Sequence, residues 1–331
     1  MGTKAPSGFG MVLLLSAWLA TPTSSQGSIV DVRGGAQEFI GLSSDGTVWS
    51  WGHDGYGILG NGHGVDMTNY TNMLYDSLVP IQVLGPNGVG VLTGMVAIAG
   101  GERHNVALDS SGNVWTWGWN YFGDLGICAY PPLTGPDSLT NTVPVQITNG
   151  FTSVVAIAAG GYHNLALKND GTVWAWGLNA KGQLGDNSKT DRHSQVEITT
   201  NLTGHGGVSQ LACGGDISAA LMADHTLLMW GRNWKGAMGN GTKDSSDVGQ
   251  WLPGPVSQAS GLTNVQAVAL GWSHAVALAF DSTVWTWGQN QRGELGLGTT
   301  SSKGSNVPTQ VAGLTNIIQV SAGEGFSAVL K

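Results

Sequence analysis

The 331-residue sequence has few charged residues and few cysteines. Only 10% of its residues are charged, and its formal net charge is -8. Its 13 Lys and Arg residues form no cluster of the kind that nucleic acids require, so we predict no nucleic-acid partner. The two cysteines, Cys128 and Cys213, lie in different repeats without Cys-x-x-Cys spacing. This favours two unpaired thiols over a disulfide.

Motifs for catalysis are also missing. The sequence has no Gly-x-Ser-x-Gly elbow, no Walker loop and no His-Glu-x-x-His. His104, His163 and His274 share one position of a repeat, but Ile217 and Phe326 fill that position in other copies. A position that accepts Ile and Phe favours structural histidines over metal ligands. We therefore predict no catalytic residue, no metal, no cofactor and no enzymatic activity.

Long hydrophobic runs are absent except near the N-terminus. Lys4 precedes an apolar stretch over residues 10–20, which is followed by small and polar residues. The stretch is too short to span a bilayer, and the order of charge, apolar run and small residues is typical of a secretory signal. We predict a cleaved signal peptide over residues 1–25, no membrane span in the mature chain, and a secreted, periplasmic or cell-envelope location. The alternative is a disordered cytosolic extension.

Glycine, in contrast, is abundant, with 53 residues that mark a repeat. The repeated block reads Gly-x-x-His-x-x-Ala-Leu-x-x-Asp-Gly-Thr-Val-Trp-x-Trp-Gly-x-Asn-x-x-Gly-x-Leu-Gly, with variations. Five copies cover residues 35–60, 101–126, 160–185, 214–239 and 271–296, and residues 323–331 begin a sixth. The spacing between successive copies has the length expected for one four-stranded sheet with its loops.

The strands of one unit can be placed in the third copy. Apolar runs predict strands over residues 154–158, 163–167 and 172–176, with an Asn-Asp-Gly turn between the last two. A weaker fourth strand is expected over residues 195–198. Equivalent segments carry a proline near their start in three copies, at Pro80, Pro144 and Pro308, which is typical of an edge strand.

Paired tryptophans indicate how the sheets pack. In Val48-Trp49-Ser50-Trp51, a period of two places both indoles on one face and the small residues on the other. The pattern recurs at Trp115 and Trp117, Trp174 and Trp176, Trp230, and Trp285 and Trp287. A large face set against a small face on the next sheet is what radial stacking requires, so we assign these nine rings to the core.

The repeat resembles that of the regulator of chromosome condensation family, and we suspect a secreted, bacterial-type member. The resemblance covers almost all of the chain from about Ile29 and implies a β-propeller, usually of seven blades. We therefore predict an all-β domain over residues 28–331, with about five complete four-stranded antiparallel blades and a partial sixth. Residues 317–321 and 326–330 supply the two strands of that partial blade. Its open edge predicts either a gapped ring or self-association.

One face of the propeller is the candidate binding site. Loops that join first to second strands and third to fourth strands emerge on the same side, and their residues vary between copies. Arginines and extra aromatic rings gather there, as is typical of protein-binding patches. The candidate residues are Tyr56, Arg103, Trp119, Tyr121, Tyr162, Arg232, Trp234, Trp272 and Arg292. The alternative is that the rings only cap the blade edges.

These observations favour a non-catalytic, secreted or cell-envelope propeller that binds a protein partner through this face. The family resemblance implies an alternative, guanine-nucleotide exchange or another regulatory role like that of chromatin-associated members, but those relatives rely on basic segments. It also includes a plant ultraviolet-B photoreceptor branch with a Gly-Trp-Arg-His-Thr motif. Here only Gly271-Trp272-Ser273-His274 is similar, and Ser273 replaces the arginine.

Overall fold

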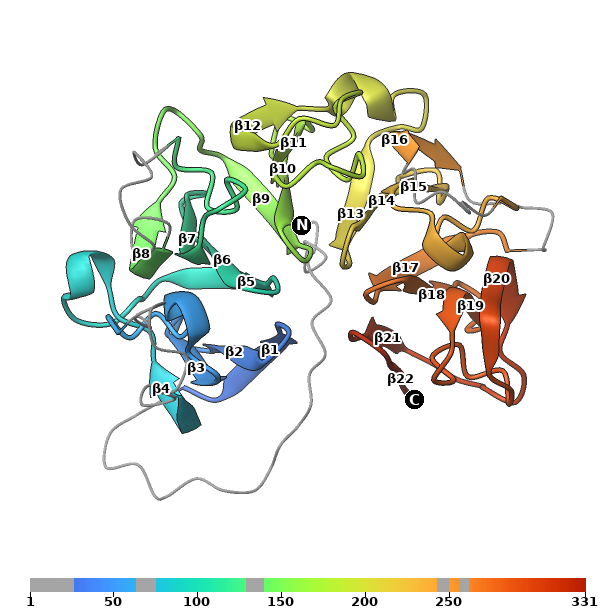
Figure 1. Ribbon diagram of the computed structural model, residues 1–331, viewed down its shortest axis with the longest axis horizontal. Helices are drawn as coiled ribbons and strands as arrows, with labels where there is room; N and C mark the ends of the chain where they lie inside the picture. Colours follow the sequence, from blue (N-terminus) through green and yellow to red (C-terminus); the bar gives the residue numbers. More distant parts are fainter. Residues whose placement is uncertain (1–26, 64–75, 129–139, 243–249, 256–261) are drawn as a thin grey trace, which may run out of the picture.

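The computed structural model describes residues 27–63, 76–128, 140–242 and 262–331, together with the backbone of residues 250–255. The chain folds as a curved row of sheets arranged around an axis, like the blades of a propeller (Figure 1). The predicted signal peptide lies outside the described residues. In the part of the chain that the structure describes, no helix has the length and apolar character needed to cross a membrane.

Each blade is a simple antiparallel meander. Five sheets have four strands each and a sixth has two, and the order within every sheet follows the order in the sequence. This confirms the predicted five blades and a partial sixth. Blade 1 comprises β1 (Ile29–Gly34), β2 (Glu38–Ser43), β3 (Val48–Gly52) and β4 (Ser77–Gln82). Blade 2 comprises β5 (Met95–Gly100), β6 (His104–Asp109), β7 (Val114–Trp119) and β8 (Thr140–Gln146).

The remaining blades follow the same plan. Blade 3 comprises β9 (Val154–Ala159), β10 (His163–Lys168), β11 (Val173–Gly177) and β12 (Arg192–Glu197). Blade 4 comprises β13 (Val208–Cys213), β14 (Ile217–Met222), β15 (Leu227–Gly231) and β16 (Gln250–Pro255). Blade 5 comprises β17 (Val265–Leu270), β18 (His274–Ala279), β19 (Val284–Asn290) and β20 (Ser301–Gln310), and blade 6 has β21 (Gln319–Ala322) and β22 (Ser327–Leu330). Short 3-10 turns lie at η1 (Gly55–Gly57), η2 (Pro86–Gly88), η4 (Thr199–Leu202) and η5 (Trp234–Gly236).

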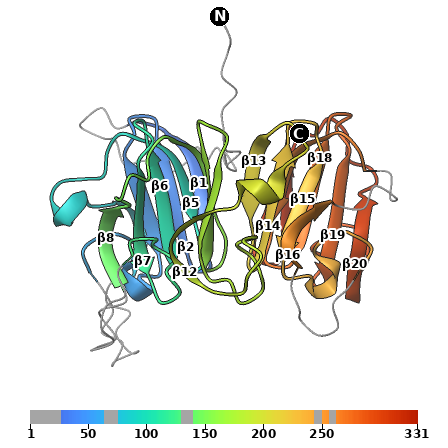
Figure 2. The same cartoon turned by 90° about the horizontal axis from the view of Figure 1, so that it is seen from above.

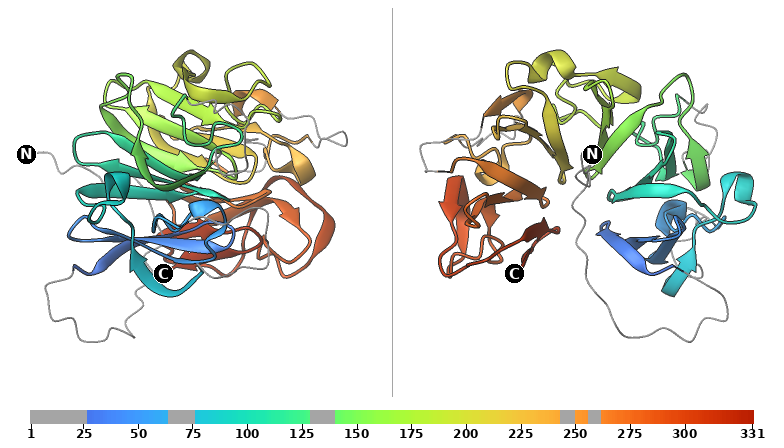
Figure 3. Two further views of the ribbon diagram at one scale, coloured as in Figure 1. Left: turned by 60° about the vertical axis from the view of Figure 1, so that its left-hand side comes forward. Right: turned by 180° about the vertical axis from the view of Figure 1, so that it is seen from behind.

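First strands line the axis of the arc. Contacts join β1 to β5, β5 to β9, β9 to β13, β13 to β17 and β17 to β21. Figure 2 shows the strands running between the two faces of the molecule, so that the loops gather at those faces. The arc does not close, because β21 and β22 of blade 6 stand apart from β1 of blade 1 (Figure 3).

The predicted prolines lie inside the outer strands instead of at their starts. Each falls where the register shifts between the third and fourth strands, as at Pro80 between the pairs Ser50–Ile81 and Gly52–Ser77. Pro144 and Pro308 occupy the same irregularity in blades 2 and 5. An irregularity in an edge strand tolerates a residue without an N–H, since no ladder hydrogen bond is needed there.

The nine tryptophans assigned to the core fall into two classes. Trp117, Trp176, Trp230 and Trp287 are fully buried between blades. The first ring of each pair is half-buried and donates its indole N–H to its own hairpin, as from Trp174 to Thr172 Oγ1 at 2.9 Å. The first ring therefore closes the turn, and in blades 2 to 5 the second ring packs the seam with the preceding blade. Trp51, the second ring of blade 1, is half-buried.

A hydrogen bond accompanies each fully buried ring. The indole N–H donates to a carbonyl in the loop of the preceding blade, from Trp117 to Ile58 at 2.9 Å and from Trp176 to Asp124 at 3.0 Å. Trp230 and Trp287 repeat the bond at 2.9 Å. Because a buried indole N–H is costly without an acceptor, these bonds fix how consecutive blades dock.

The repeated histidines belong to the same seams. His104 Nε2 lies 2.8 Å from Asn164 Oδ1 of the next blade, and His163 Nε2 lies 2.8 Å from Ser218 Oγ. Burial lowers the pKa of His104 to about 4, so its ring is neutral at physiological pH. The interpretation of these histidines as structural residues is thus supported by their geometry.

The described residues contain no group of three His, Cys, Asp or Glu that would hold a metal ion.

Cys128 and Cys213 are both free, as the sequence predicts. Burial raises the pKa of the Cys213 thiol, so it stays protonated. The Cys213 thiol therefore lacks the lowered pKa of a reactive thiolate.

Candidate protein-binding face

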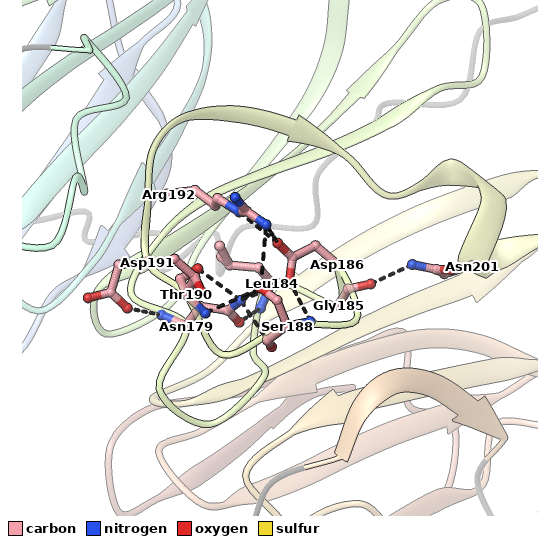
Figure 4. A network of polar contacts seen from close by, with 9 residues as sticks. All are labelled: Asn179, Leu184, Gly185, Asp186, Ser188, Thr190, Asp191, Arg192 and Asn201. Atoms are coloured by element: carbon pink, nitrogen blue, oxygen red, sulfur yellow. Dashed lines mark hydrogen bonds and ion pairs between the residues drawn. The ribbon is translucent and has the colours of Figure 1, made fainter.

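The loops after the third strands are held by an asparagine of the repeat. In blade 3, Asn179 Oδ1 accepts the backbone N–H of Leu184 at 3.0 Å, while its amide group donates to Asp186 Oδ1 and to the Thr190 carbonyl. Arg192 Nε donates to Asp186 Oδ2 at 2.7 Å and closes the base of the loop. Figure 4 shows this network, which fixes the backbone and leaves the tip of the loop free to vary.

The same scaffold recurs in the other complete blades. Asn120, Asn233 and Asn290 each accept the backbone N–H of the residue five positions later. In blade 1 the position is Asp54, whose Oδ1 accepts from Leu59 at 3.0 Å. Burial raises the pKa of Asp54 to about 6, and Asn61 supplies the amide donor that the carboxylate lacks. Equivalent loop positions therefore present their side chains at equivalent places on each blade.

Five aromatic rings from blades 1, 2 and 3 gather on this scaffold, and with Arg103 we call them the aromatic platform. Its members are Tyr56, Arg103, Trp119, Tyr121, Phe122 and Tyr162. Trp119 is at the centre, because its ring centroid lies 5.3 to 5.7 Å from those of all four other rings. Tyr121 stacks on Trp119 and is 50% exposed, whereas the other members are half-buried.

Arg103 ties blade 2 to blade 1 within the platform. Its guanidinium lies 4.6 Å from the centroid of Tyr56 and 5.2 Å from that of Trp119. It also donates a hydrogen bond to Tyr56 Oη at 2.6 Å. A guanidinium held between two rings in this way is pre-organised, so a partner that binds the platform pays little entropy to order it.

Two acidic side chains contact residues of the platform, since Glu102 bonds to Tyr162 and Asp124 Oδ2 accepts the backbone N–H of Phe122 at 3.4 Å. Burial, together with a hydrogen bond from its hydroxyl to Glu102, raises the pKa of Tyr162, so this hydroxyl stays protonated. Asp124 is fully buried, and burial raises its pKa well above the ordinary value. The platform thus stands on neutral or hydrogen-bonded groups, and Arg103 is its cationic member.

The other sequence candidates lie outside the platform. Arg232 and Lys235 lie over the ring of Trp234 in blade 4, at 5.3 and 5.1 Å from its centroid. The Trp272 indole lies against the backbone of Gly215, and Arg292 lies beside Gly325 in blade 6. The structure therefore brings together five of the nine predicted residues in the platform, Tyr56, Arg103, Trp119, Tyr121 and Tyr162. Two others, Arg232 and Trp234, contact each other separately in blade 4.

Two residues of this region were missing from the candidates. Phe122 contacts Trp119, Tyr121 and Tyr162, and Glu102 bonds to Tyr162. Both lie in the same two loops as predicted members, and their adjacency to Tyr121 and Arg103 in the sequence is the signal that points to them.

Comparison with known proteins identifies the family. Residues 16–329 match the model of the RCC1-like domain. The chain belongs to the RCC1-like family. This agrees with the resemblance seen in the repeat.

The individual relatives share about 30% of their residues with this chain over the matched regions. The Arabidopsis thaliana ultraviolet-B receptor UVR8 is 28% identical over 89% of this chain and 61% of its own length. Human E3 ubiquitin-protein ligase HERC2 is 31% identical over 82% of this chain but only 5% of its own length. The chain therefore spans about three fifths of UVR8 and about a twentieth of HERC2.

Solved structures support the same fold. The crystal structure of human WBSCR16 covers 91% of this chain with a TM-score of 0.74 and 25% identity, and the match takes in 71% of that chain. Yeast RCC1 (Prp20), solved bound to Kap60, covers 91% with a TM-score of 0.70 and 22% identity, over 67% of that chain. The second likeness shows the fold alone.

Proposed function

We propose that this chain is a non-catalytic, protein-binding propeller that holds its partner with the aromatic platform. The observation that carries the proposal is the convergence of Tyr56, Arg103, Trp119, Tyr121 and Tyr162 from three blades into one patch. Trp, Tyr and Arg are the residues that dominate binding energy at protein interfaces. The structural relatives also include a propeller solved in complex with a protein, yeast RCC1 bound to Kap60.

We further propose that the protein acts outside the cytoplasm, in a secreted, periplasmic or envelope location. The apolar run over residues 10–20 after Lys4 supports this proposal. The regulatory and exchange roles of chromatin-associated members receive less support, because such roles rely on basic segments and this chain carries a net charge of -8.

A capture experiment with matched variants tests the binding role. The baits are the wild-type chain, Tyr121→Ala, and Phe280→Ala, whose exposed ring lies at the turn between β18 and β19, away from the platform. Proteins from the native extracellular fraction are quantified by mass spectrometry on each bait. We expect a partner that Phe280→Ala retains and Tyr121→Ala loses.

The purified partner is then titrated against each variant by calorimetry. Removal of an aromatic anchor from a protein interface costs about 2 kcal/mol or more, so we expect Kd to rise about 30-fold for Tyr121→Ala. Equal affinity for both variants would refute the platform as the binding site, and the melting temperature of each variant shows whether it is folded.

A further inference from the structure

Blade 1 has an exposed apolar face on the side away from blade 2. Phe39 is 49% exposed and Ile29 is 43% exposed there, and Phe39 stacks on Trp51 at 5.5 Å between ring centroids. In blades 2 and 3 the residues equivalent to Phe39 and Trp51 are completely buried by the preceding blade. The face of blade 1 therefore has the composition of a blade seam without a blade upon it.

Blade 6 has the complementary face exposed. Phe326 is 59% exposed and Leu330 is 46% exposed. The equivalent residues of blade 2, His104 and Leu108, are buried against blade 3. This second face is the side of a blade that, elsewhere in the arc, covers the next blade.

The internal seams show which residues fit together. At each seam, the residue in the repeat's histidine position faces a residue in the second strand of the next blade. Polar residues meet polar ones in three seams, where His104 contacts Asn164, His163 contacts Ser218 and His274 contacts Ser327. In the first seam the two positions hold Glu38 and Asn105, which are both polar and buried. The one apolar residue, Ile217, meets Ala275, and both belong to the same buried cluster.

The two exposed faces follow the same rule. Phe326 occupies the histidine position of blade 6, and Phe39 occupies the receiving position of blade 1. Both are apolar, so they match each other as Ile217 matches Ala275. Within one molecule these faces stand apart (Figure 3), because the five internal seams set the curvature of the arc.

We propose that blade 6 of one molecule packs on blade 1 of a second molecule, head to tail, so that Phe326 meets Phe39 across a seam like those inside the arc. The contact uses two different surfaces, so each pair of molecules leaves one free face of each kind. Assembly then continues beyond the dimer, into a closed ring or a filament. This association does not involve the aromatic platform and is independent of the proposed partner binding.

The test uses two complementary variants, Phe39→Glu and Phe326→Glu. Each variant blocks one face and keeps the other, and both rings are exposed, so the melting temperatures should stay near that of the wild type. Light scattering after size exclusion, at concentrations up to about 100 μM, measures the mass. We expect oligomers for the wild type and for the control Phe280→Glu, and monomers for each blocked variant alone.

The decisive sample is an equal mixture of the two variants. Phe39→Glu retains its blade 6 face and Phe326→Glu retains its blade 1 face, so the mixture should form dimers that grow no further. A monomeric wild type at every concentration overturns the proposal. So does a dimer that persists in either variant alone, which would indicate pairing between the edges of two β22 strands.

Discussion

At the scale of single residues, Glu38 shows how a seam tolerates an acidic group. It occupies the histidine position of blade 1 and is 1% exposed, and burial raises its pKa from 4.5 to about 8. Glu38 Oε1 and Asn105 Oδ1 are both buried, and neither atom has a hydrogen-bond partner among the described residues. We infer that the protonated carboxyl donates to Asn105, as His104 bonds to Asn164.

This inference gives a pH dependence. In the unfolded chain Glu38 loses its proton near pH 4.5, whereas in the folded chain it keeps the proton up to about pH 8. The folded state therefore binds more protons over that range, and its stability falls as pH rises from 4.5 to 8. The free energy of unfolding, measured with urea, should fall less between pH 5 and pH 8 for Glu38→Gln than for the wild type.

The histidines change stability in the opposite direction. Burial lowers the pKa of His104 to about 4 and of His163 to about 3, so the unfolded chain takes up their protons first as pH falls below 6.5. Because both proteins in the comparison contain these histidines, subtracting one profile from the other isolates Glu38. Parallel profiles for the wild type and Glu38→Gln would contradict the protonated carboxyl.

The sequence predicts the role of the histidines better than that of Glu38. Two copies of the repeat have Ile217 and Phe326 in the position of the histidines, which argues against a set of metal ligands there. The hydrogen bonds across the seams explain why a histidine in one blade is paired with a serine or an asparagine in the next. Protonation of Glu38 depends on burial by blade 2, which no local pattern reveals.

At the scale of strands, the alternation of the tryptophans places one ring in the seam and the other over the hairpin. The sequence predicts the strands to within a few residues, because the repeat displays each strand five times. It does not distinguish the two rings of a pair, since both have the same periodicity. Nor does it show that Tyr56, Trp119 and Tyr162 meet, because their contact depends on the packing of three separate blades.

Stability measurements separate the seam rings from the exposed one. Trp117 is fully buried and donates to Ile58, so Trp117→Ala should cost about 3 to 5 kcal/mol in the free energy of unfolding. Trp51 holds the same repeat position but is only half-buried, and Trp51→Ala should cost clearly less. Equal losses of unfolding free energy for the two variants would mean that the blade 1 face is covered in solution. The molecular mass at the same protein concentration would then show whether a second molecule covers it.

At the scale of the whole molecule, the arc is a series of near-identical seams, and each seam depends on two neighbours. Repeat proteins of this kind gain stability from nearest-neighbour interfaces, so the seam between blades 5 and 6 is expected to be the weakest of the five. Blade 6 contributes two strands to it and provides no indole there. The carbonyl of Glu294 in blade 5 accepts only Ser327 Oγ among the described residues, at 2.7 Å.

The equivalent carbonyl between blades 3 and 4 accepts two bonds. Gln183 receives Ser218 Oγ at 2.7 Å and the indole N–H of Trp230 at 2.9 Å. A third strand added to blade 6 should therefore place a tryptophan on Glu294. We predict that a copy of residues 280–288, fused after Lys331, raises the free energy of unfolding by about 2 kcal/mol through burial of this ring.

The matched control is the same fusion with its second tryptophan, the copy of Trp287, replaced by alanine. It keeps the added length and the hairpin turn but removes the ring and the indole donor. Because the ring is the main source of buried apolar area in the added strand, the control should show little of the predicted increase in the free energy of unfolding. Urea unfolding measured for the original chain and for both fusions decides the matter: equal stability of the two fusions would show that the blade 6 seam does not accept the ring that completes every internal seam from blade 1 to blade 5.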